Sequence, residues 1–319
     1  MKEKPKILIT GADGFVGKNL LQALLRSDEY FLYAHTRNPI NLNLVVNIVG
    51  DLRDIRILDH YLPGIDCVIH LAAKVSYNKK DQKEIYRDNV ILTRDLVNQC
   101  LIHNVPRIIY ISSASTLTRS SDPFLITEKS SGRPIFHSFY AKSKYLGELE
   151  IKRGEAEGMQ VQILNPCLML GKGDWTKGSL QLIKRIGEGL RYFPSGNLGI
   201  VDVQILIEAI QICLKKDSSS GPHLLWQASF SYKDFINKVC EIMNIESPKI
   251  EIGPKMAAWY SRFKEWRSFI LKKHNLISTE TAFLSSHSFQ FVVHNPLPGL
   301  TKKRLDLDEV IKKSIHHNI

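Results

Sequence analysis

Three glycines near the N-terminus constrain the fold of this chain more than any other feature. They are Gly11, Gly14 and Gly17, and they have the spacing G-x-x-G-x-x-G. The apolar run 7–9 before them predicts a buried strand, and leucines at i, i+1, i+4 and i+5 after them predict a helix. A strand, a glycine turn and a helix N-terminus in this order form a phosphate site, because the turn's amides and the helix dipole both favour an anion.

Each glycine has a separate reason to stand in such a turn. Gly11 permits the tight turn, Gly14 lets the backbone approach a pyrophosphate, and Gly17 lets helix and strand pack closely. The position after a strand and before a helix favours a dinucleotide site over an ordinary βα turn. A P-loop for nucleoside triphosphates is excluded, because that motif needs G-x-x-x-x-G-K-[ST] and Lys18 is followed here by Asn19.

Length and composition limit the class of protein. The 319 residues are 44% hydrophobic and 24% charged, which is ordinary for a globular chain. No apolar run approaches the roughly 20 residues of a membrane span. We expect no signal peptide, since residues 1–6 lead directly into the first strand. Five scattered cysteines without metal-ligand spacing predict mostly buried, reduced thiols, no metal site and a cytoplasmic location. The net charge of +11 is spread along the chain, so we expect no nucleic-acid partner.

The end of the second apolar strand, 30–34, bears on the choice of cofactor. Arg37 stands there, twenty positions beyond Gly17, where NAD-binding folds carry an acidic residue that binds the ribose 2′-hydroxyl. A guanidinium in place of a carboxylate suits a 2′-phosphate, so we expect NADP, with NAD left open. The alternative interpretation of Arg37 is a solvated surface side chain.

Apolar strands alternate with helices along the first part of the chain. The pattern predicts a helix over 89–100 and strands over 45–49, 66–73, 107–115 and 161–164. Such alternation indicates an α/β fold with a doubly wound parallel sheet, the Rossmann arrangement. We assign residues 1–165 and about 199–216 to this dinucleotide-binding domain, and residues 166–198 and 217–319 to a smaller, α-rich substrate lobe.

Several residues at the strand ends are candidate ligand contacts, because open parallel sheets bind ligands at the carboxyl ends of their strands. Asp51 is a candidate for an adenine contact or, alternatively, for the cap of the next helix. Ala72 and Ala73 are small enough for a cofactor to lie across the strand tip. Serine hydroxyls, among them that of Ser113, cluster at the C-terminal end of the strand predicted over 107–115, and a long polar excursion at 119–137 comes next.

Tyr140 and Lys144 lie at i and i+4, on one face of a predicted helix. A phenol titrates near 10, and a neighbouring cation stabilises the phenolate and lowers that pKa. With Ser113 to orient a carbonyl or hydroxyl, this pair can supply the proton that accompanies hydride transfer from a nicotinamide. Tested alone the pattern is weak, and the alternative for Tyr140 is a packed helix tyrosine.

Together these motifs resemble the extended short-chain dehydrogenase/reductases, the NAD-dependent epimerase/dehydratase superfamily. The resemblance covers nearly the whole chain and implies that Ser113, Tyr140 and Lys144 are catalytic, with Lys144 also bonding the nicotinamide ribose. The cofactor contacts that we expect are Gly11, Gly14, Phe15, Val16, Gly17, Arg37, Asp51, Leu52, Ala72, Ala73, Asn89, Tyr140, Lys144 and Pro166.

Two segments, 36–39 and 164–175, resemble the dihydroflavonol-reductase and 3β-hydroxysteroid-dehydrogenase-like branch of that superfamily. Asn-Pro stands at 165–166, where nucleotide-sugar epimerases usually carry Arg-Pro. The resemblance therefore implies an NADPH-dependent carbonyl reductase or alcohol dehydrogenase with a small-molecule substrate. The alternatives are a nucleotide-sugar epimerase or dehydratase with tightly held NAD, and a non-catalytic nucleotide-sensing protein. Proteins of the last kind commonly lose the Tyr/Lys pair that this chain keeps.

The segment 256–271 combines aromatic and basic residues. Trp259, Phe263, Trp266 and Ile270 recur at helical spacing, with lysines and arginines nearby. This pattern predicts either a basic amphipathic helix on a membrane surface or a lid helix packed over the pocket. A homodimer is also left open, and the motifs do not identify the substrate.

Overall fold

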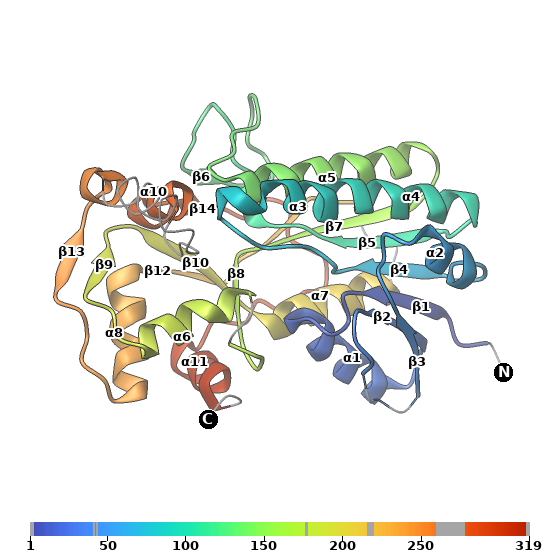
Figure 1. Cartoon of the computed structure of the whole chain (residues 1–319), viewed down its shortest axis with the longest axis horizontal. Coiled ribbons are helices and arrows are strands. Elements are labelled where there is room, and N and C mark those ends of the chain that lie inside the picture. The colour runs from blue at the N-terminus through green and yellow to red at the C-terminus, as the bar shows by residue number, and fades with distance from the viewer. Residues whose placement is uncertain are drawn as a thin grey trace.

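A parallel sheet forms the centre of the larger lobe (Figure 1). The computed structural model describes residues 3–40, 42, 44–175, 178–215, 220–259 and 278–316, and within them this sheet has seven strands. In chain order they are β1 (Lys6–Thr10), β2 (Phe31–Thr36), β3 (Val45–Val49), β4 (Cys67–His70), β5 (Arg107–Ile111), β7 (Gln160–Pro166) and β11 (His223–Leu225). The α/β fold with a doubly wound parallel sheet is confirmed.

The spatial order of the strands is β11-β7-β5-β4-β1-β2-β3, and each neighbouring pair runs parallel. The order reverses between β1 and β4, which is the switch point where open α/β sheets bind ligands. The strands of the sheet's centre are continuous apolar runs because helices cover both faces. All four residues of β4 are buried, for example.

Two layers of helices cover the sheet (Figure 1). On one face lie α1 (Phe15–Ser27) and α7 (Val203–Lys215), and on the other α2 (Ile55–Tyr61), α4 (Leu92–Ile102) and α5 (Phe139–Ala156). Side chains alternate between the two cores along each strand. Ile7 and Ile9 pack in the core with α1 and α7, while Leu8 packs in the opposite core with α2, α4 and α5.

A smaller lobe packs beside the carboxyl edge of this sheet (Figure 1). Its three-stranded sheet has the order β12 (Ala228–Ser231), β10 (Asn197–Asp202), β8 (Leu168–Leu170). The helices α6 (Gln181–Gly187), α8 (Tyr232–Met243) and α11 (Leu307–His316) share a third core with it. Phe235, Ile236 and Val239, on one face of α8, are buried in that core.

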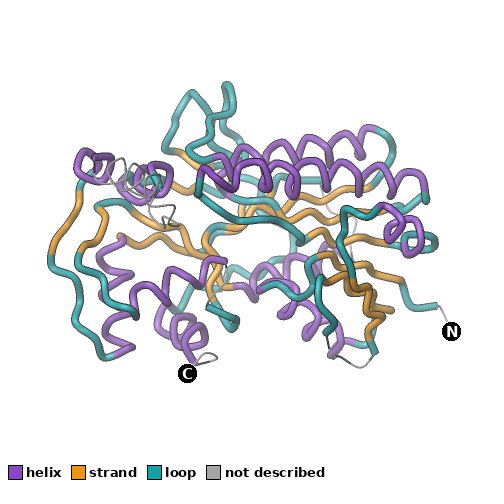
Figure 2. The backbone as a smooth tube through the Cα atoms, viewed as in Figure 1, coloured by secondary structure: helices purple, strands orange, loops and turns teal. Residues whose placement is uncertain are grey.

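Two pairs of short strands complete the described elements. β9 (Tyr192–Pro194) pairs with β13 (Ile250–Ile252). β6 (Leu125–Ile126) pairs with β14 (Gln290–Phe291), close to α10 (Thr279–Ser286). β6 belongs to the predicted polar excursion at 119–137, which is almost entirely loop (Figure 2). The excursion is therefore held by the C-terminal part of the chain.

Two expectations about the second half of the chain are wrong. Residues 217–319 do not all belong to the smaller lobe, because β11 is the edge strand of the main sheet, where it pairs with β7. The segment 199–216 was assigned to the dinucleotide-binding domain, but only α7 packs on the main sheet. β10 lies in the small sheet. Three-residue strands such as β11 carry too little pattern to be assigned from sequence.

Two predicted strands end earlier than expected. The strand predicted over 66–73 ends at His70, and the one over 107–115 ends at Ile111. After β5, Ser113 caps a short 3-10 helix, η3 (Ala114–Thr116), and this helix prevents β5 from continuing to residue 115. Before α4 the chain forms α3 (Gln82–Tyr86) and a π-helical turn, η2 (Arg87–Ile91), where a plain helix from Asn89 was expected.

The described residues of the chain include no helix with both the length and the apolar character that a bilayer span requires. Of the predicted amphipathic helix at 256–271, residues 256–259 are described and residues 260–271 lie outside the described part of the chain. Its placement on a membrane surface or over a pocket stays a prediction.

The glycine turn is tightly packed between β1, β4 and α1. Gly11 has φ +67°, a conformation that favours glycine, and a Cβ there would lie 2.9 Å from the Cα of Ala72. A Cβ on Gly17 would lie 2.5 Å from the carbonyl oxygen of Gly11. Both obstacles are backbone atoms, so the expected close approach of helix, turn and strand leaves no space for a side chain.

Replacing Gly17 by alanine should therefore strain the contact between α1 and the turn at Gly11 and Ala12. We expect Gly17→Ala to lower the free energy of unfolding by about 1–3 kcal/mol in urea denaturation. Gly253→Ala is the matched control, since a Cβ there meets nothing within 4 Å, and its change should stay within about 0.5 kcal/mol. Equal stability of the Gly17 variant and the unaltered protein would contradict this account.

Candidate active site

The N-terminus of α1 presents backbone amides with no acceptor in the helix. The amides of Phe15, Val16 and Gly17 come before the first intrahelical hydrogen bond, from Lys18 N to the carbonyl oxygen of Gly14 (3.0 Å). Gly14, the N-cap, makes no side-chain cap, and the described first turn has no acidic residue. The pyrophosphate of a dinucleotide fits this site, because the amides lack acceptors, the helix end is positive and the N-cap residue Gly14 has no side chain in the way.

The ends of β2 and β3 hold the residues expected near the adenosine. Arg37 is exposed just beyond β2. Asp51 does not cap α2, because Asp54 does so, accepting a hydrogen bond from the backbone N–H of Arg56 (3.1 Å). Asp51 instead pairs with Arg53, whose hydrogen bonds lower the pKa of Asp51 to about 2. The predicted adenine contact of Asp51 stays a prediction.

A buried histidine joins the ends of β1 and β4. The hydroxyl of Thr93 donates to the carbonyl oxygen of Asn89 (2.9 Å), so it accepts from Nε2 of His70 (3.1 Å). Nδ1 of His70 is then the acceptor for the hydroxyl of Thr10 (2.7 Å). Thr10 Oγ1 in turn accepts from the amide of Ala72 (3.2 Å). Burial, with a smaller effect of Lys144, lowers the pKa of His70 to about 3, so the ring is neutral.

The predicted cofactor contact Asn89 lies in the π-helical turn and its side chain is part of the fold. Its Oδ1 accepts from the amide of Lys74 (2.7 Å), and its Nδ2 donates to Ser143 Oγ (2.9 Å). Ser143 Oγ donates to the carbonyl oxygen of Tyr140 (2.7 Å). A Cβ on Gly147 would lie 2.8 Å from the carbonyl oxygen of Asn89, so α5 packs directly on this turn. π-Helical turns are frequent at functional sites.

Lys144 is buried on α5, one turn after Tyr140. It is 2% exposed, and its Nζ lies 4.1 Å from the centre of the Tyr110 ring, a cation–π contact. Burial lowers the pKa of Lys144 to about 7, and the carboxylate of Glu148 opposes this shift. A buried lysine with a pKa near neutrality at a sheet's carboxyl edge is typical of a functional site.

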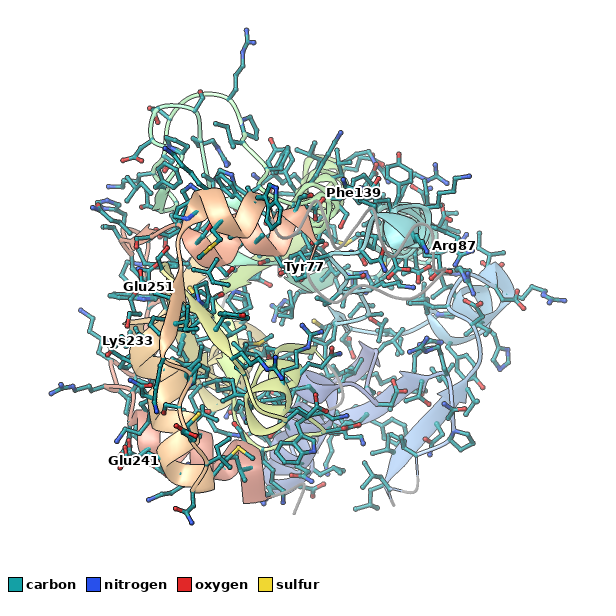
Figure 3. All side chains as sticks on the ribbon, turned by 60° about the vertical axis from the view of Figure 1, so that its left-hand side comes forward. Tyr77, Arg87, Phe139, Lys233, Glu241 and Glu251 are labelled. Atoms are coloured by element: carbon teal, nitrogen blue, oxygen red, sulfur yellow. The ribbon has the colours of Figure 1, made fainter. Side chains whose placement is uncertain are left out.

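The expected lowering of the Tyr140 pKa by Lys144 does not occur in this structure. Burial raises the pKa of Tyr140 instead, and Tyr77 adds to the shift. The rings of Tyr77 and Tyr140 meet edge to face, with centroids 6.0 Å apart. Burial likewise raises the pKa of Tyr77 to about 12. Figure 3 shows Tyr77 in the middle of the molecule, between the small lobe and the main sheet. Both phenols are therefore neutral donors at neutral pH.

Ser113 lies at the same edge of the sheet, directly after β5, the strand that carries Tyr110. Its Oγ accepts from the amide of Ser115 (3.3 Å) and lies 2.9 Å from Ser115 Oγ. The short helix that Ser113 caps is tied to α5, because the hydroxyl of Thr116 donates to Glu148 (2.8 Å). The structure thus brings the elements of Ser113, Tyr140 and Lys144 together at one end of the sheet.

Three residues near this site carried no sequence prediction. Glu148 had a signal, since it continues the i, i+4 series of Tyr140 and Lys144 on one helical face. Tyr77 and Tyr110 had none, because a tyrosine in a loop or a buried strand has no motif of its own.

Among the other predicted cofactor contacts, Leu52 is buried and Ala72 is half-buried, while Ala73 is exposed. The five cysteines are buried, as expected. Within the described ranges, no group of His, Cys, Asp and Glu side chains is placed to hold a metal ion.

Comparisons with known proteins agree with this geometry. A model of the NAD dependent epimerase/dehydratase family matches residues 7–202. The chain is 29% identical over 194 residues to the 2-alkyl-3-oxoalkanoate reductase of Stenotrophomonas maltophilia, with 58% of this chain and 56% of that protein covered. It is 25% identical over 305 residues to the decarboxylating sterol-4-alpha-carboxylate 3-dehydrogenase of Dictyostelium discoideum, with 89% and 91% covered. The chain thus spans little more than half the length of the first of these relatives.

A solved structure supports the fold over the whole chain. The UDP-glucuronic acid 4-epimerase of Bacillus cereus, in complex with UDP-glucuronic acid and NAD, has a TM-score of 0.77 at 18% identity. The match covers 98% of both chains. At this identity the likeness concerns the fold alone, so the small lobe is part of the shared architecture.

The buried Lys144 should make stability depend on pH. Its pKa is about 7 in the folded protein against an ordinary 10.5, so between these values the unfolded chain binds a proton that the folded protein does not. Stability then rises with pH in this window and is constant below it. Relative to Lys144→Met, we expect the free energy of unfolding to increase by about 1–3 kcal/mol from pH 7 to about pH 9.5.

Urea denaturation at a series of pH values measures this difference. Lys152→Met is the matched control, because Lys152 is exposed on the same helix, and its difference from the unaltered protein should not change with pH. A pH-independent difference for Lys144→Met would contradict the burial of this amine.

Proposed function

The chain belongs to the NAD-dependent epimerase/dehydratase family, and on this premise we propose that it is an NADPH-dependent carbonyl reductase or alcohol dehydrogenase. The resemblance found from the motifs is thereby confirmed at the level of the family. The observation that carries the proposal is the pair Tyr140 and Lys144, one turn apart on α5 at the carboxyl edge of the sheet. An amine with a pKa near 7 and a neutral phenol suit proton transfer at neutral pH.

Each residue of the site has a distinct task in reduction. When bound, the nicotinamide supplies the hydride. Tyr140, kept protonated by its buried position, donates a proton to the carbonyl oxygen of the substrate. Ser113 donates a hydrogen bond to the same oxygen and so orients it. The ammonium of Lys144 stabilises the phenolate that Tyr140 becomes, because catalytic contacts that are loose in a free enzyme tighten in its complexes. In the oxidation of an alcohol the same proton moves in the opposite direction.

The cofactor contacts fit around the glycine turn. The amides of Phe15, Val16 and Gly17 would hold the pyrophosphate, and Arg37 would pair with a 2′-phosphate beyond β2. The family's cofactors are NAD and NADP, and the preference for NADP rests on Arg37 alone. Tyr77 lies against Tyr140 and would line the substrate side of the site.

The alternative within the family is a nucleotide-sugar epimerase or dehydratase. Asn165 supports the reductase, because its amide donates to Glu148 (2.7 Å) and to Thr116 (3.0 Å) inside the fold. Position 165 therefore offers no cation to a nucleotide diphosphate. An epimerase of this family re-reduces its substrate with the same tightly held NAD. Purified protein that carries stoichiometric NAD and acts on nucleotide sugars would favour the alternative. NADPH oxidation with ketones, aldehydes or sterols would support the reductase.

Tyr140→Phe tests the proton donor. The variant loses one hydroxyl and keeps the ring's packing against Tyr77, so kcat should fall by about 10²–10⁴-fold. NADPH affinity, measured by fluorescence titration, should barely change because the glycine turn lies elsewhere. Tyr145→Phe on the same helix is the control and should keep the full rate. A Tyr140→Phe protein with unaltered kcat would show that another group carries the proton.

Arg37→Ala tests the choice of cofactor. Loss of a charge-assisted contact to the 2′-phosphate should weaken NADPH binding by about 10- to 100-fold and leave NADH binding nearly unchanged. Arg26→Ala, an exposed arginine near the other end of α1, should alter neither affinity. Equal affinity of the unaltered protein for NADPH and NADH would refute the proposed preference.

A further inference from the structure

Glu148 is a carboxylate buried in the interior of the large lobe. It is 3% exposed and lies on α5 one turn after Lys144, which is 2% exposed. Burial of an ionised carboxylate is unfavourable unless hydrogen bonds or an opposite charge compensate it. The neighbours of Glu148 must therefore explain why a carboxylate is present at this position.

The carboxylate connects three elements. Oε1 accepts from the hydroxyl of Thr116 in η3 (2.8 Å) and from the amide of Asn165 in β7 (2.7 Å). Both donors also lie near the backbone carbonyl oxygen of Ser113, Thr116 Oγ1 at 2.9 Å and Asn165 Nδ2 at 3.3 Å, and the single hydroxyl proton of Thr116 is shared between Glu148 and this carbonyl. Glu148 thus fixes the backbone at Ser113 to the helix that carries Tyr140 and Lys144.

The carboxylate is also the negative charge next to Lys144. The titratable groups that act on or contact the amine come from three elements: His70 on β4, Tyr110 on β5 and Glu148 on α5, the helix on which Tyr140 lies one turn before Lys144. The ring of His70 is neutral, and burial keeps Tyr110 and Tyr140 in their neutral forms. Among these described groups, Glu148 alone favours the charged form of Lys144.

Hydrogen bonding alone does not require a carboxylate here. The side-chain oxygen of a glutamine could accept from the same two donors. What a glutamate adds at this position is its charge, and removing one member of a buried pair of opposite charges is destabilising because the other charge is left uncompensated.

We propose that Glu148 is a positioning residue of the active site, which holds the backbone of Ser113 against α5 and supplies the buried negative charge that balances the ammonium of Lys144. The inference rests on the proposed function for the roles of Ser113 and Lys144. Glu148 touches no substrate or cofactor, and it acts only through these two residues.

The charge is tested on the amine itself, without substrate. In protein with ¹³C-labelled lysine ε-carbons, the Lys144 signal is identified by its absence in Lys144→Met, and its titration is followed by NMR. Glu148→Gln should lower the midpoint of this titration by about one pH unit, because a nearby opposite charge favours the charged amine. Glu155→Gln, an exposed glutamate on the same helix, should not move it.

The consequence for catalysis is tested by the pH profile of kcat. Reduction needs the ammonium of Lys144 to stabilise the phenolate that Tyr140 becomes, so the loss of kcat with rising pH should set in at lower pH in Glu148→Gln. Thr116→Val removes one tie to Ser113 and keeps the charge. This variant should lower kcat by up to about 10²-fold through misplacement of Ser113. The midpoint of the Lys144 titration and the pH dependence of kcat should stay the same as in the unaltered protein.

The outcomes separate this inference from the proposed function. An unchanged Lys144 midpoint in Glu148→Gln, or an equal shift in Glu155→Gln, would overturn the inference. Should Glu148→Gln fail to fold, the double variant Glu148→Gln/Lys144→Met, which leaves neither charge uncompensated, should restore folding, and a double variant that also fails to fold would overturn the inference. If the unaltered protein reduces no carbonyl compound, the proposed function fails, and the titration still reports on Glu148.

Discussion

The hydrogen bonds between the ends of β1 and β4 hold together everything that surrounds the site. Thr10 and His70 are fully buried at the switch point of the sheet, with Thr10 Oγ1 2.7 Å from His70 Nδ1. Further hydrogen bonds connect Thr10 to the amide of Ala72 and connect His70, through Thr93, to the backbone of Asn89. The glycine turn and the π-helical turn are thereby fixed to the same two strands. In a low-dielectric interior such a fully satisfied network is rigid, because any opening would leave a buried group without a partner.

The network continues from the π-helical turn into α5, the helix that carries Tyr140 and Lys144. Asn89 donates to Ser143, and Ser143 donates to the carbonyl oxygen of Tyr140. Gly147 lets α5 pack closely against the same turn and against the hydroxyl of Tyr110, since a Cβ at Gly147 would meet both. The spacing between the N-terminus of α1 and the backbone of Tyr140 therefore depends on buried hydrogen bonds and close backbone packing. The proposed reduction would need such fixed spacing, because hydride and proton must reach adjacent atoms of one substrate.

The sequence predicted those parts of the structure that depend on local pattern. The glycine spacing located β1, the turn and α1, and apolar runs located the central strands within a few residues. The pairing of Tyr140 with Lys144 on one face followed from helical periodicity. Of the partners of Lys144, Glu148 had a signal in the same i, i+4 series, whereas Tyr110 reaches the amine only through tertiary packing. The shift of the Lys144 pKa to about 7 comes from burial. The edge strand β11 was missed because three residues pair only once β7 is in place.

The small lobe is not a contiguous piece of the chain. The backbone passes from β7 of the main sheet into β8 of the small one, returns from β10 to α7, and leaves again from β11 to β12. No single cut in the gene separates a cofactor module from a substrate module. Recombination that exchanges whole segments would therefore break both cores at once. A protein of this design can change its substrate range only by substitutions and loop insertions made in place, while the sheet that holds the cofactor is retained unaltered.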